Sequence, residues 1–313
     1  MNRALVNIGV GKRRGIRHLK KFLPLYVMMI PCVVYLVVFK YLPILGNVIA
    51  FQNYNIVKGI WGSSWAKPFY RHFYMFFQSS YFTQLMRNTL VLSATKLFFN
   101  TVSSVVLALL LNEVRNKAFK RVVQTVVYMP HFLSWVIIYG ILLSLFSQSN
   151  GLINLLLDKH FGVKLAIFNS NVPFFWTLVL SSVWKGAGWG AIVYLAAITG
   201  IDPTLYEAAR IDGANRWQCI WHVTLSGIRS TIVIMMILNL GSIMNAGFDQ
   251  VFVMYNIQVY EISDIIDTWV YRTGLTQLNY SLSTAVSLFK TVISFVLVMT
   301  VNWIAKRFEE GLW

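Results

Sequence analysis

A set of polar and charged side chains lies inside long apolar stretches of the sequence, where each could contact a polar solute. The set comprises Lys185, Trp189, Asn239, Asn245, Asp249, Gln250 and Lys290. Amides suit the hydroxyls of a sugar, and a flat aromatic surface suits the face of a sugar ring. Charges in an apolar span are costly, so they pair with one another or face a water-filled cavity. Two hypotheses therefore stay open. Either the side chains line a path for a solute, or Lys185 or Lys290 pairs with Asp249 and the amides join neighbouring helices.

The balance of charge in this set indicates which solute would fit. Lys96, in another apolar stretch, brings the lysines to three, against Asp249 as the one acid nearby. The first hypothesis therefore predicts a positive cavity. Such a cavity favours an anionic sugar, for example a uronic-acid oligomer.

Motifs that catalyse reactions are missing from the sequence. It contains no P-loop for ATP, no His-Glu-x-x-His zinc motif, no nucleophile elbow and no Cys-x-x-Cys. Cys32 falls in an apolar stretch and Cys219 in a polar one, so we do not expect them to pair. A membrane glycosyltransferase would need paired acids or a metal site. Glu261, Asp264 and Asp267 form the only acidic cluster, and we expect them to be a solvated helix edge. The sequence thus predicts a non-catalytic chain without metal or cofactor, which takes its energy from a partner.

The composition places the chain in a lipid bilayer. Of its 313 residues, 57% are hydrophobic and 12% are charged, and the mean hydropathy is +0.60. That is more apolar surface than the core of one soluble domain can hide. Six stretches approach the roughly 20 residues that a membrane span needs: about 22–42, 89–111, 122–146, 174–198, 231–251 and 283–304. We therefore predict an all-α membrane protein with six transmembrane helices.

The net charge of +16 follows from the predicted topology. Lysine and arginine are concentrated in residues 1–21, 115–121, 201–230 and 305–313, whereas the other connecting segments carry fewer for their length. Positive loops stay on the cytoplasmic side of a membrane. Both termini and segment 201–230 are therefore predicted to be cytoplasmic, and nucleic acid is not needed to explain the charge.

Three local patterns predict the shape of the spans. Pro130 should kink the third span, because proline removes one backbone hydrogen bond. Ser182, Gly186 and Gly190 share one stripe of the fourth span, which predicts a close helix-packing face. The aromatic residues between Lys40 and Asn88 predict a helix lying at the outer membrane interface. A landing surface for an external binding protein is the alternative for this aromatic segment.

Segment 201–230 is polar and sits between two apolar spans. Thr204 and Glu207 have the spacing of a capping box, which predicts a short helix from about Leu205 to Asp212–Gly213. A second helix should follow at once, with Asn215 as its N-cap and Gln218 three residues later. The small side chains of Ala208 and Ala209 would let another protein approach the first helix closely. We therefore interpret it as a docking surface.

The run Glu207-Ala208-Ala209, followed by Asp212-Gly213, resembles the signature of the membrane-spanning subunits of ABC importers. In that family the helix pair couples the permease to an ATP-hydrolysing subunit, which implies this role for Glu207, Ala208, Ala209, Asp212 and Gly213. Ser226 stands where the family usually has proline. The path of the chain after the helix pair is therefore where this sequence departs from the family pattern. The resemblance to the sugar permeases extends from about residue 68 to the C-terminus. It includes Gly247-Phe248-Asp249-Gln250-Val251, which is similar to permeases for products of polysaccharide breakdown.

The resemblance implies a type I importer permease in the plasma membrane of a bacterium. Its expected partners are a second homologous permease, two ATP-binding subunits, an extracellular solute-binding lipoprotein and an oligosaccharide. The alternatives are a permease for another solute, such as a polyamine or an anion, and a membrane glycosyltransferase. A further alternative is a secondary transporter or channel. Secondary transporters are commonly built from internal repeats, and the sequence lacks a convincing one.

These features divide the chain into four regions. Residues 1–21 form the basic cytoplasmic tail, and 22–85 hold the first span and the extracellular aromatic segment. Residues 86–304 form the transport domain, with its coupling loop at 201–230, and 305–313 form the cytoplasmic end.

Overall fold

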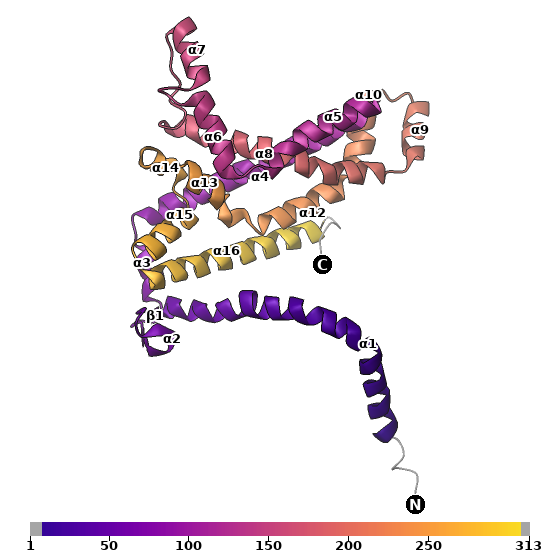
Figure 1. The fold of residues 1–313 in the computed structure, drawn as a ribbon. Coiled ribbons are helices and arrows are strands. Elements are labelled where there is room, and N and C mark those ends of the chain that lie inside the picture. The colour runs from indigo at the N-terminus through magenta and orange to yellow at the C-terminus, as the bar shows by residue number, and fades with distance from the viewer. Residues whose placement is uncertain (1–7, 308–313) are drawn as a thin grey trace, which may run out of the picture.

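The computed structural model describes residues 8–307, with side chains from Phe22 onward, as an elongated assembly of helices (Figure 1). The predicted basic tail at 1–21 and residues 308–313 of the predicted C-terminal region lie outside the side chains described. A two-stranded hairpin, β1 (Gln52–Asn53) and β2 (Ser64–Trp65), marks one end of the molecule. We call it the hairpin end, and the opposite end, which carries α9 (Pro203–Ile211), the α9 end.

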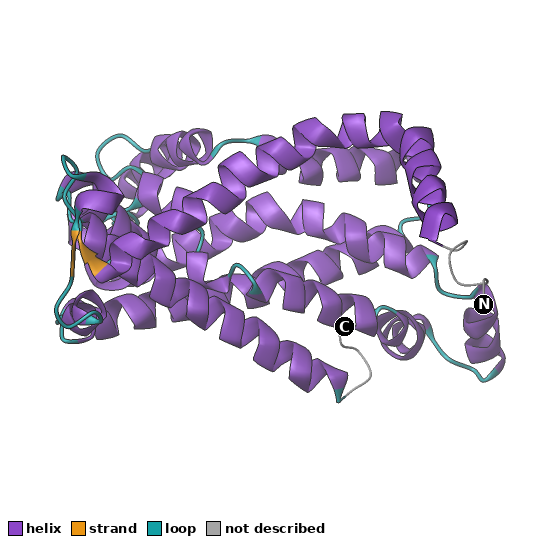
Figure 2. Cartoon of the chain, turned by 90° about the horizontal axis from the view of Figure 1, so that it is seen from below, coloured by secondary structure: helices purple, strands orange, loops and turns teal. Residues whose placement is uncertain are grey.

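Four helical segments are long and apolar enough to cross a membrane: Phe22–Phe51, α4 (Tyr81–Glu113), α8 (Asn171–Thr199) and α16 (Tyr280–Lys306). The first combines most of α1 (Ile8–Leu36) with η1 (Val37–Tyr41) and η2 (Leu42–Phe51). Two bent pairs of helices bring the candidate spans to six. The long helices run along a common axis (Figure 2). The predicted all-α membrane fold is confirmed.

The third span is bent sharply, as Pro130 predicts. Its first half comprises α5 (Lys117–Tyr128) and the turn η3 (Met129–Phe132), and its second half is α6 (Trp135–Phe146). The two halves meet at 104°. The Ser134 hydroxyl caps α6 by accepting a hydrogen bond from the Ile137 amide at 3.3 Å. The bend therefore starts a new helix instead of curving an old one.

The predicted fifth span at 231–251 is wrong in its boundaries. The helix α12 (Arg229–Leu240) stops at Gly241, and the chain continues as the turn η5 (Ile243–Asn245) and the short helix α13 (Phe248–Met254). Ala246 and Gly247 between them have left-handed backbones, with φ of 48° and 73°. The candidate span is instead Arg216–Leu240, which bends by 53° before α12. Its first part comprises α10 (Arg216–Gln218), η4 (Cys219–Thr224) and α11 (Leu225–Gly227).

The helices α4 and α8 pack along each other at the centre of the molecule. A Cβ atom at Gly186 would lie 2.7 Å from Asn100 Oδ1, and one at Gly190 would lie 2.4 Å from Ser104 Oγ. A Cβ atom at Gly188 would come within 2.0 Å of the Val127 carbonyl oxygen in α5. The predicted small-residue stripe of α8 is thus a close packing face directed at α4, whereas Gly188, outside that stripe, packs against α5.

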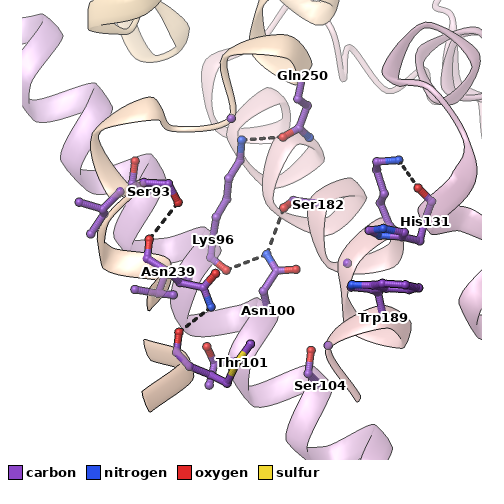
Figure 3. Close-up of a pocket in the computed structure, with 18 of the residues that line it drawn as sticks. Ser93, Lys96, Asn100, Thr101, Ser104, His131, Ser182, Trp189, Asn239 and Gln250 are labelled. Atoms are coloured by element: carbon purple, nitrogen blue, oxygen red, sulfur yellow. Dashed lines mark hydrogen bonds between the residues drawn. The ribbon is translucent and has the colours of Figure 1, made fainter. Parts of the chain in front are cut away.

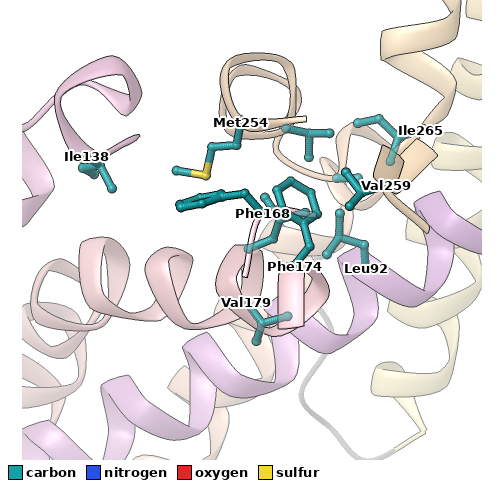
Figure 4. Close-up of a cluster of buried hydrophobic side chains, with 11 residues drawn as sticks. Leu92, Ile138, Phe168, Phe174, Val179, Met254, Val259 and Ile265 are labelled. Carbon is teal, nitrogen blue, oxygen red and sulfur yellow. The ribbon is translucent and has the colours of Figure 1, made fainter. Parts of the chain in front are cut away.

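The largest apolar cluster lies toward the hairpin end, where α4, α8 and α13 meet (Figure 4). Leu92, Phe174 and Met254 are fully buried there. Short elements complete this end of the molecule: α7 (Leu152–Phe161), η6 (Ile257–Val259), α14 (Tyr260–Ser263), α15 (Ile266–Tyr271) and η7 (Arg272–Thr276).

The aromatic segment before α4 is only partly surface. It forms the hairpin, α2 (Gly59–Gly62) and α3 (Arg71–Phe77), and Phe76 of α3 is buried against Trp269 and Phe289. The prediction of one interfacial helix is therefore wrong, because part of the segment packs into the bundle. Trp61 is 96% exposed, so the hypothesis of a landing surface stays a prediction.

His72 makes the hairpin end sensitive to pH. The buried ring hydrogen-bonds through Nε2 to the Gln52 carbonyl oxygen at 3.0 Å, and burial lowers the pKa of His72. The unfolded chain therefore binds the proton more tightly than the folded chain does. The free energy of unfolding is highest above about pH 6.5 and decreases as the pH falls below it. We expect the melting temperature to drop between about pH 7.5 and about pH 5.5, and to drop less in His72→Gln. Thermal unfolding in detergent measures both, and equal drops would contradict the assignment.

Candidate functional site

A cavity of about 430 Å³ lies inside the bundle, between α4, α8, α12 and the broken segment after α12 (Figure 3). Its polar and aromatic lining comprises Ser93, Lys96, Asn100, Thr101, Ser104, His131, Trp135, Ser182, Lys185, Trp189, Tyr194, Asn239, Ser242 and Gln250. The lining includes two lysines and, within the described part of the chain, neither aspartate nor glutamate. The described lining therefore carries a net positive charge, and the cavity is open where Trp189 and Asn239 are exposed.

Lys96 joins α4 to the broken segment. Its Nζ donates to the Ala246 carbonyl oxygen at 2.9 Å. It also donates to Gln250 Oε1 at 2.6 Å (Figure 3). The amide nitrogen of Gln250 in turn donates to the Leu178 carbonyl oxygen and to Ser181 Oγ, each at 2.8 Å. Both acceptors of Lys96 are neutral groups.

Lys185 holds the bend of the third span. Its Nζ donates to the His131 carbonyl oxygen at 2.7 Å and to the Leu133 carbonyl oxygen, and both carbonyls belong to the bend. One helical turn further along α8, Trp189 stacks on the His131 ring with the centroids 4.5 Å apart (Figure 3). The same face of α8 thus lines the cavity and fixes the bend.

The structure brings together only some of the residues predicted to line a solute path. Lys185, Trp189, Asn239 and Gln250 line the cavity, whereas Asn245, Asp249 and Lys290 do not. Lys290 Nζ lies 2.6 Å from Asp267 Oδ1 and 2.9 Å from Asn245 Oδ1.

Asp249 is exposed and pairs with neither lysine. The hypothesis that Lys185 or Lys290 pairs with Asp249 is therefore wrong, because the helix break turns Asp249 away from both.

The acidic cluster is not a solvated helix edge. Asp264 is 2% exposed and forms a salt bridge with Arg272 at 2.6 Å, while Asp267 binds Lys290. Glu261 is exposed and accepts a hydrogen bond from Asn171. Two of the three acids are thus committed to ion pairs within the fold.

At the α9 end, the helix α9 begins differently from the prediction. Asp202 is the N-cap, and its Oδ1 accepts a hydrogen bond from the Thr204 amide at 2.9 Å. This hydrogen bond lowers the pKa of Asp202. The predicted capping box of Thr204 and Glu207 is therefore wrong, since Pro203 already occupies the first turn of the helix.

The end of α9 follows the prediction. Gly213 closes it in the left-handed conformation, with φ of 83°. Asn215 and Gln218 form a reciprocal capping box for the next helix, with hydrogen bonds of 2.7 and 3.0 Å.

The helix α9 presents an open surface. Glu207, Ala208, Asp212 and Gly213 are exposed. They lie among exposed apolar side chains, namely Leu205, Ile211, Trp217 and Trp221. A second hollow of about 210 Å³, lined by Ala209, Asp212 and Gly213 among others, lies beside the helix. Exposed patches of this kind are typical of interaction surfaces, and the docking role of α9 stays a prediction.

Sequence reasoning missed several residues of the cavity. Ser93, Asn100 and Ser104 were not singled out, although their spacing with Lys96 puts one polar stripe on α4. That periodicity is the signal that could have found them. His131 gave no such signal, because only the bend brings its ring onto α8.

Comparisons with known proteins identify the class to which this architecture belongs. Residues 100–313 match the family of binding-protein-dependent transport system inner membrane components, and the chain belongs to this family.

The chain is similar to two Bacillus subtilis proteins along most of their lengths. It is 45% identical over 290 residues to the polygalacturonan/rhamnogalacturonan transport system permease protein YteP, covering 92% of this chain and 90% of YteP. It is 44% identical over 289 residues to protein LplB, with the same coverage.

The fold is similar to that of a bacterial ABC transporter involved in the import of the acidic polysaccharide alginate. The TM-score is 0.85 at 36% identity, and the match covers 94% of this chain and 99% of the solved one. A structure of a bacterial alginate ABC transporter with an alginate pentasaccharide-bound periplasmic protein has the same score, with 98% of its chain covered.

Proposed function

We propose that the chain is the permease subunit of an ATP-driven importer for oligosaccharides, and that acidic, uronic-acid-containing oligosaccharides are its preferred solutes. The observation that carries the substrate class is the cavity, whose lining among the described residues holds Lys96 and Lys185 but no acid. The amides of Asn100 and Asn239 and the rings of Trp135 and Trp189 suit sugar hydroxyls and ring faces. The relatives whose names mention polygalacturonan and alginate support the same substrate class.

The partners follow from the family and from α9. We propose that Glu207, Ala208, Ala209, Asp212 and Gly213 dock into one of two ATP-hydrolysing subunits. All but the half-buried Ala209 are exposed, and the exposed apolar side chains of Leu205 and Ile211 belong to the same helix. A second permease would close the cavity, and an extracellular binding protein would deliver the sugar. The structure of the alginate transporter in complex with an alginate pentasaccharide-bound periplasmic protein supports this partner.

The orientation in the membrane is part of the proposal. The positive charge of segments 115–121 and 201–230 favours a cytoplasmic α9 end and an extracellular hairpin end, with both termini inside. We retain residues 86–304 as the transport domain, preceded by the first span and the aromatic segment.

The other functions fit the observations less well. A polyamine would be repelled by the two lysines of the cavity, whose described lining holds no acid. A glycosyltransferase would need unpaired acids, whereas Asp264 and Asp267 form salt bridges with Arg272 and Lys290.

Uptake into proteoliposomes that contain the complete importer tests this function. We expect ATP-dependent uptake of trigalacturonate to exceed that of its neutral methyl ester. We expect Lys185→Gln to lower uptake of the acid roughly 10-fold, because the cavity loses half of its lysine charge. Lys164→Gln is the control, since Lys164 forms an exposed salt bridge with Asp158. Equal uptake of both sugars, unchanged in Lys185→Gln, would contradict the substrate class.

A further inference from the structure

We propose that Lys96 and Ser93 form a binding subsite for one carboxylate of the transported sugar, and that Lys96 selects acidic over neutral sugars. The inference rests on the proposed function and assigns its charge selectivity to a defined place in the cavity. That place is the junction of α4 with the broken segment at Ala246–Gly247 (Figure 3).

Within residues 22–307, the fold places no acidic side chain in hydrogen-bond contact with the Lys96 ammonium. Lys96 is 7% exposed, and its two acceptors, the Ala246 carbonyl and the Gln250 amide oxygen, are neutral. Asp249, the acid nearest in sequence to Gln250, is exposed and lies outside the lining. An ammonium has three donors, and these two hydrogen bonds use two of them. One donor therefore remains for a ligand.

Ser93 supplies a second unused donor on the same side of α4. Its side chain is buried, and Oγ has no hydrogen-bond partner in the part of the chain that the structure describes. Residues three apart on a helix are neighbours on its surface, so Ser93 lies one turn from Lys96. Both side chains line the cavity. A buried hydroxyl without a partner costs stability, and a carboxylate that accepts from both groups would remove that cost.

The surrounding residues fix the position of the ammonium. Because both donors of the Gln250 amide bind α8, its oxygen must face Lys96. A Cβ atom at Gly247 would lie 3.0 Å from Lys96 Nζ, so the glycine leaves room for the ammonium. The break in the helix thus creates a charged subsite that a continuous helix would not provide.

The experiment compares uptake of trigalacturonate and its methyl ester by variants of the complete importer in proteoliposomes. We expect Lys96→Met to lower the ratio of acid to ester uptake roughly 30-fold, since one partner of a buried charge pair is lost. Lys96→Arg, which keeps the charge, should hold the ratio within about threefold. Lys290→Met is the comparison, because its lysine already pairs with Asp267 outside the cavity lining and its loss should affect both sugars alike.

Ser93→Ala separates binding from folding. It breaks no hydrogen bond of the described structure, so the complex should melt at the same or a higher temperature while uptake of the acid falls. If Lys96→Met lowers the uptake of both sugars in equal proportion, or lowers the uptake of neither, the subsite is refuted although the importer works. If the wild-type importer takes up neither sugar, the proposed function fails and this inference fails with it.

Discussion

Glu207→Lys should abolish solute uptake while leaving the permease folded and inserted in the membrane. Glu207 is exposed on α9, so the fold does not depend on its side chain. If the Glu207 carboxylate faces a positive group of the ATP-hydrolysing subunit, Glu207→Lys places two positive charges together. Such a like-charge contact costs several kcal/mol in protein interfaces. We expect uptake to fall roughly 100-fold and the stimulation of ATP hydrolysis by solute to vanish. Proteoliposome uptake and ATPase assays on the same preparation measure both.

The matched control is Glu113→Lys. Glu113 is also exposed, at the last residue of α4, and a positive charge suits the C-terminal end of a helix. Uptake in this variant should stay near that of the wild type. Normal uptake by Glu207→Lys, or an equal loss in both variants, would remove Glu207 from the coupling surface.

Gly188→Ala should prevent stable packing of the third span. The new Cβ atom would lie 2.0 Å from the Val127 carbonyl oxygen and 2.7 Å from the Val127 carbonyl carbon, both backbone atoms. Since no rotamer change can relieve a clash with the backbone, α5 and α8 must separate. Overpacking of this kind costs roughly 1–3 kcal/mol or more, so we expect the melting temperature to fall by about 5 °C or more. Thermal unfolding of the purified complex measures it.

Gly140→Ala is the control for this prediction. A Cβ atom at Gly140, in α6, meets nothing within 4 Å. Alanine also favours a helix over glycine, so the melting temperature should stay the same or rise. A drop as large as that of Gly188→Ala would mean that the effect does not come from the contact with Val127.

Local signals in the sequence predicted the end of α9 and the start of the next helix. Gly213 closes a helix because its backbone is left-handed, and Asn215 and Gln218 cap the next helix through atoms three residues apart. Such interactions depend on neighbours in the chain, so spacing alone reveals them. The start of α9 was missed because Asp202 and Thr204 were both suitable caps, and the position of Pro203 decided between them.

The polar pairing inside the membrane could not be predicted from spacing. Hydropathy shows one apolar stretch at 231–251, but the chain breaks at Gly241 and again at Ala246–Gly247. That break directs Gln250 toward Lys96 and leaves Asp249 exposed. Lys290 likewise forms a salt bridge with Asp267, which is close only because α15 packs on α16. Partner choice among distant residues follows from packing, which a single sequence does not display.

Labelling of a cysteine on α9 tests most directly the central claim that this helix receives an ATPase inside the cell. Ala208 is exposed, and Ala208→Cys can be made after Cys32 and Cys219 are replaced by serine. A membrane-impermeant maleimide should label it in inverted vesicles but not in intact cells, and the bound ATP-hydrolysing subunits should protect it. Labelling from outside the cell, or labelling that those subunits leave unchanged, would contradict the account.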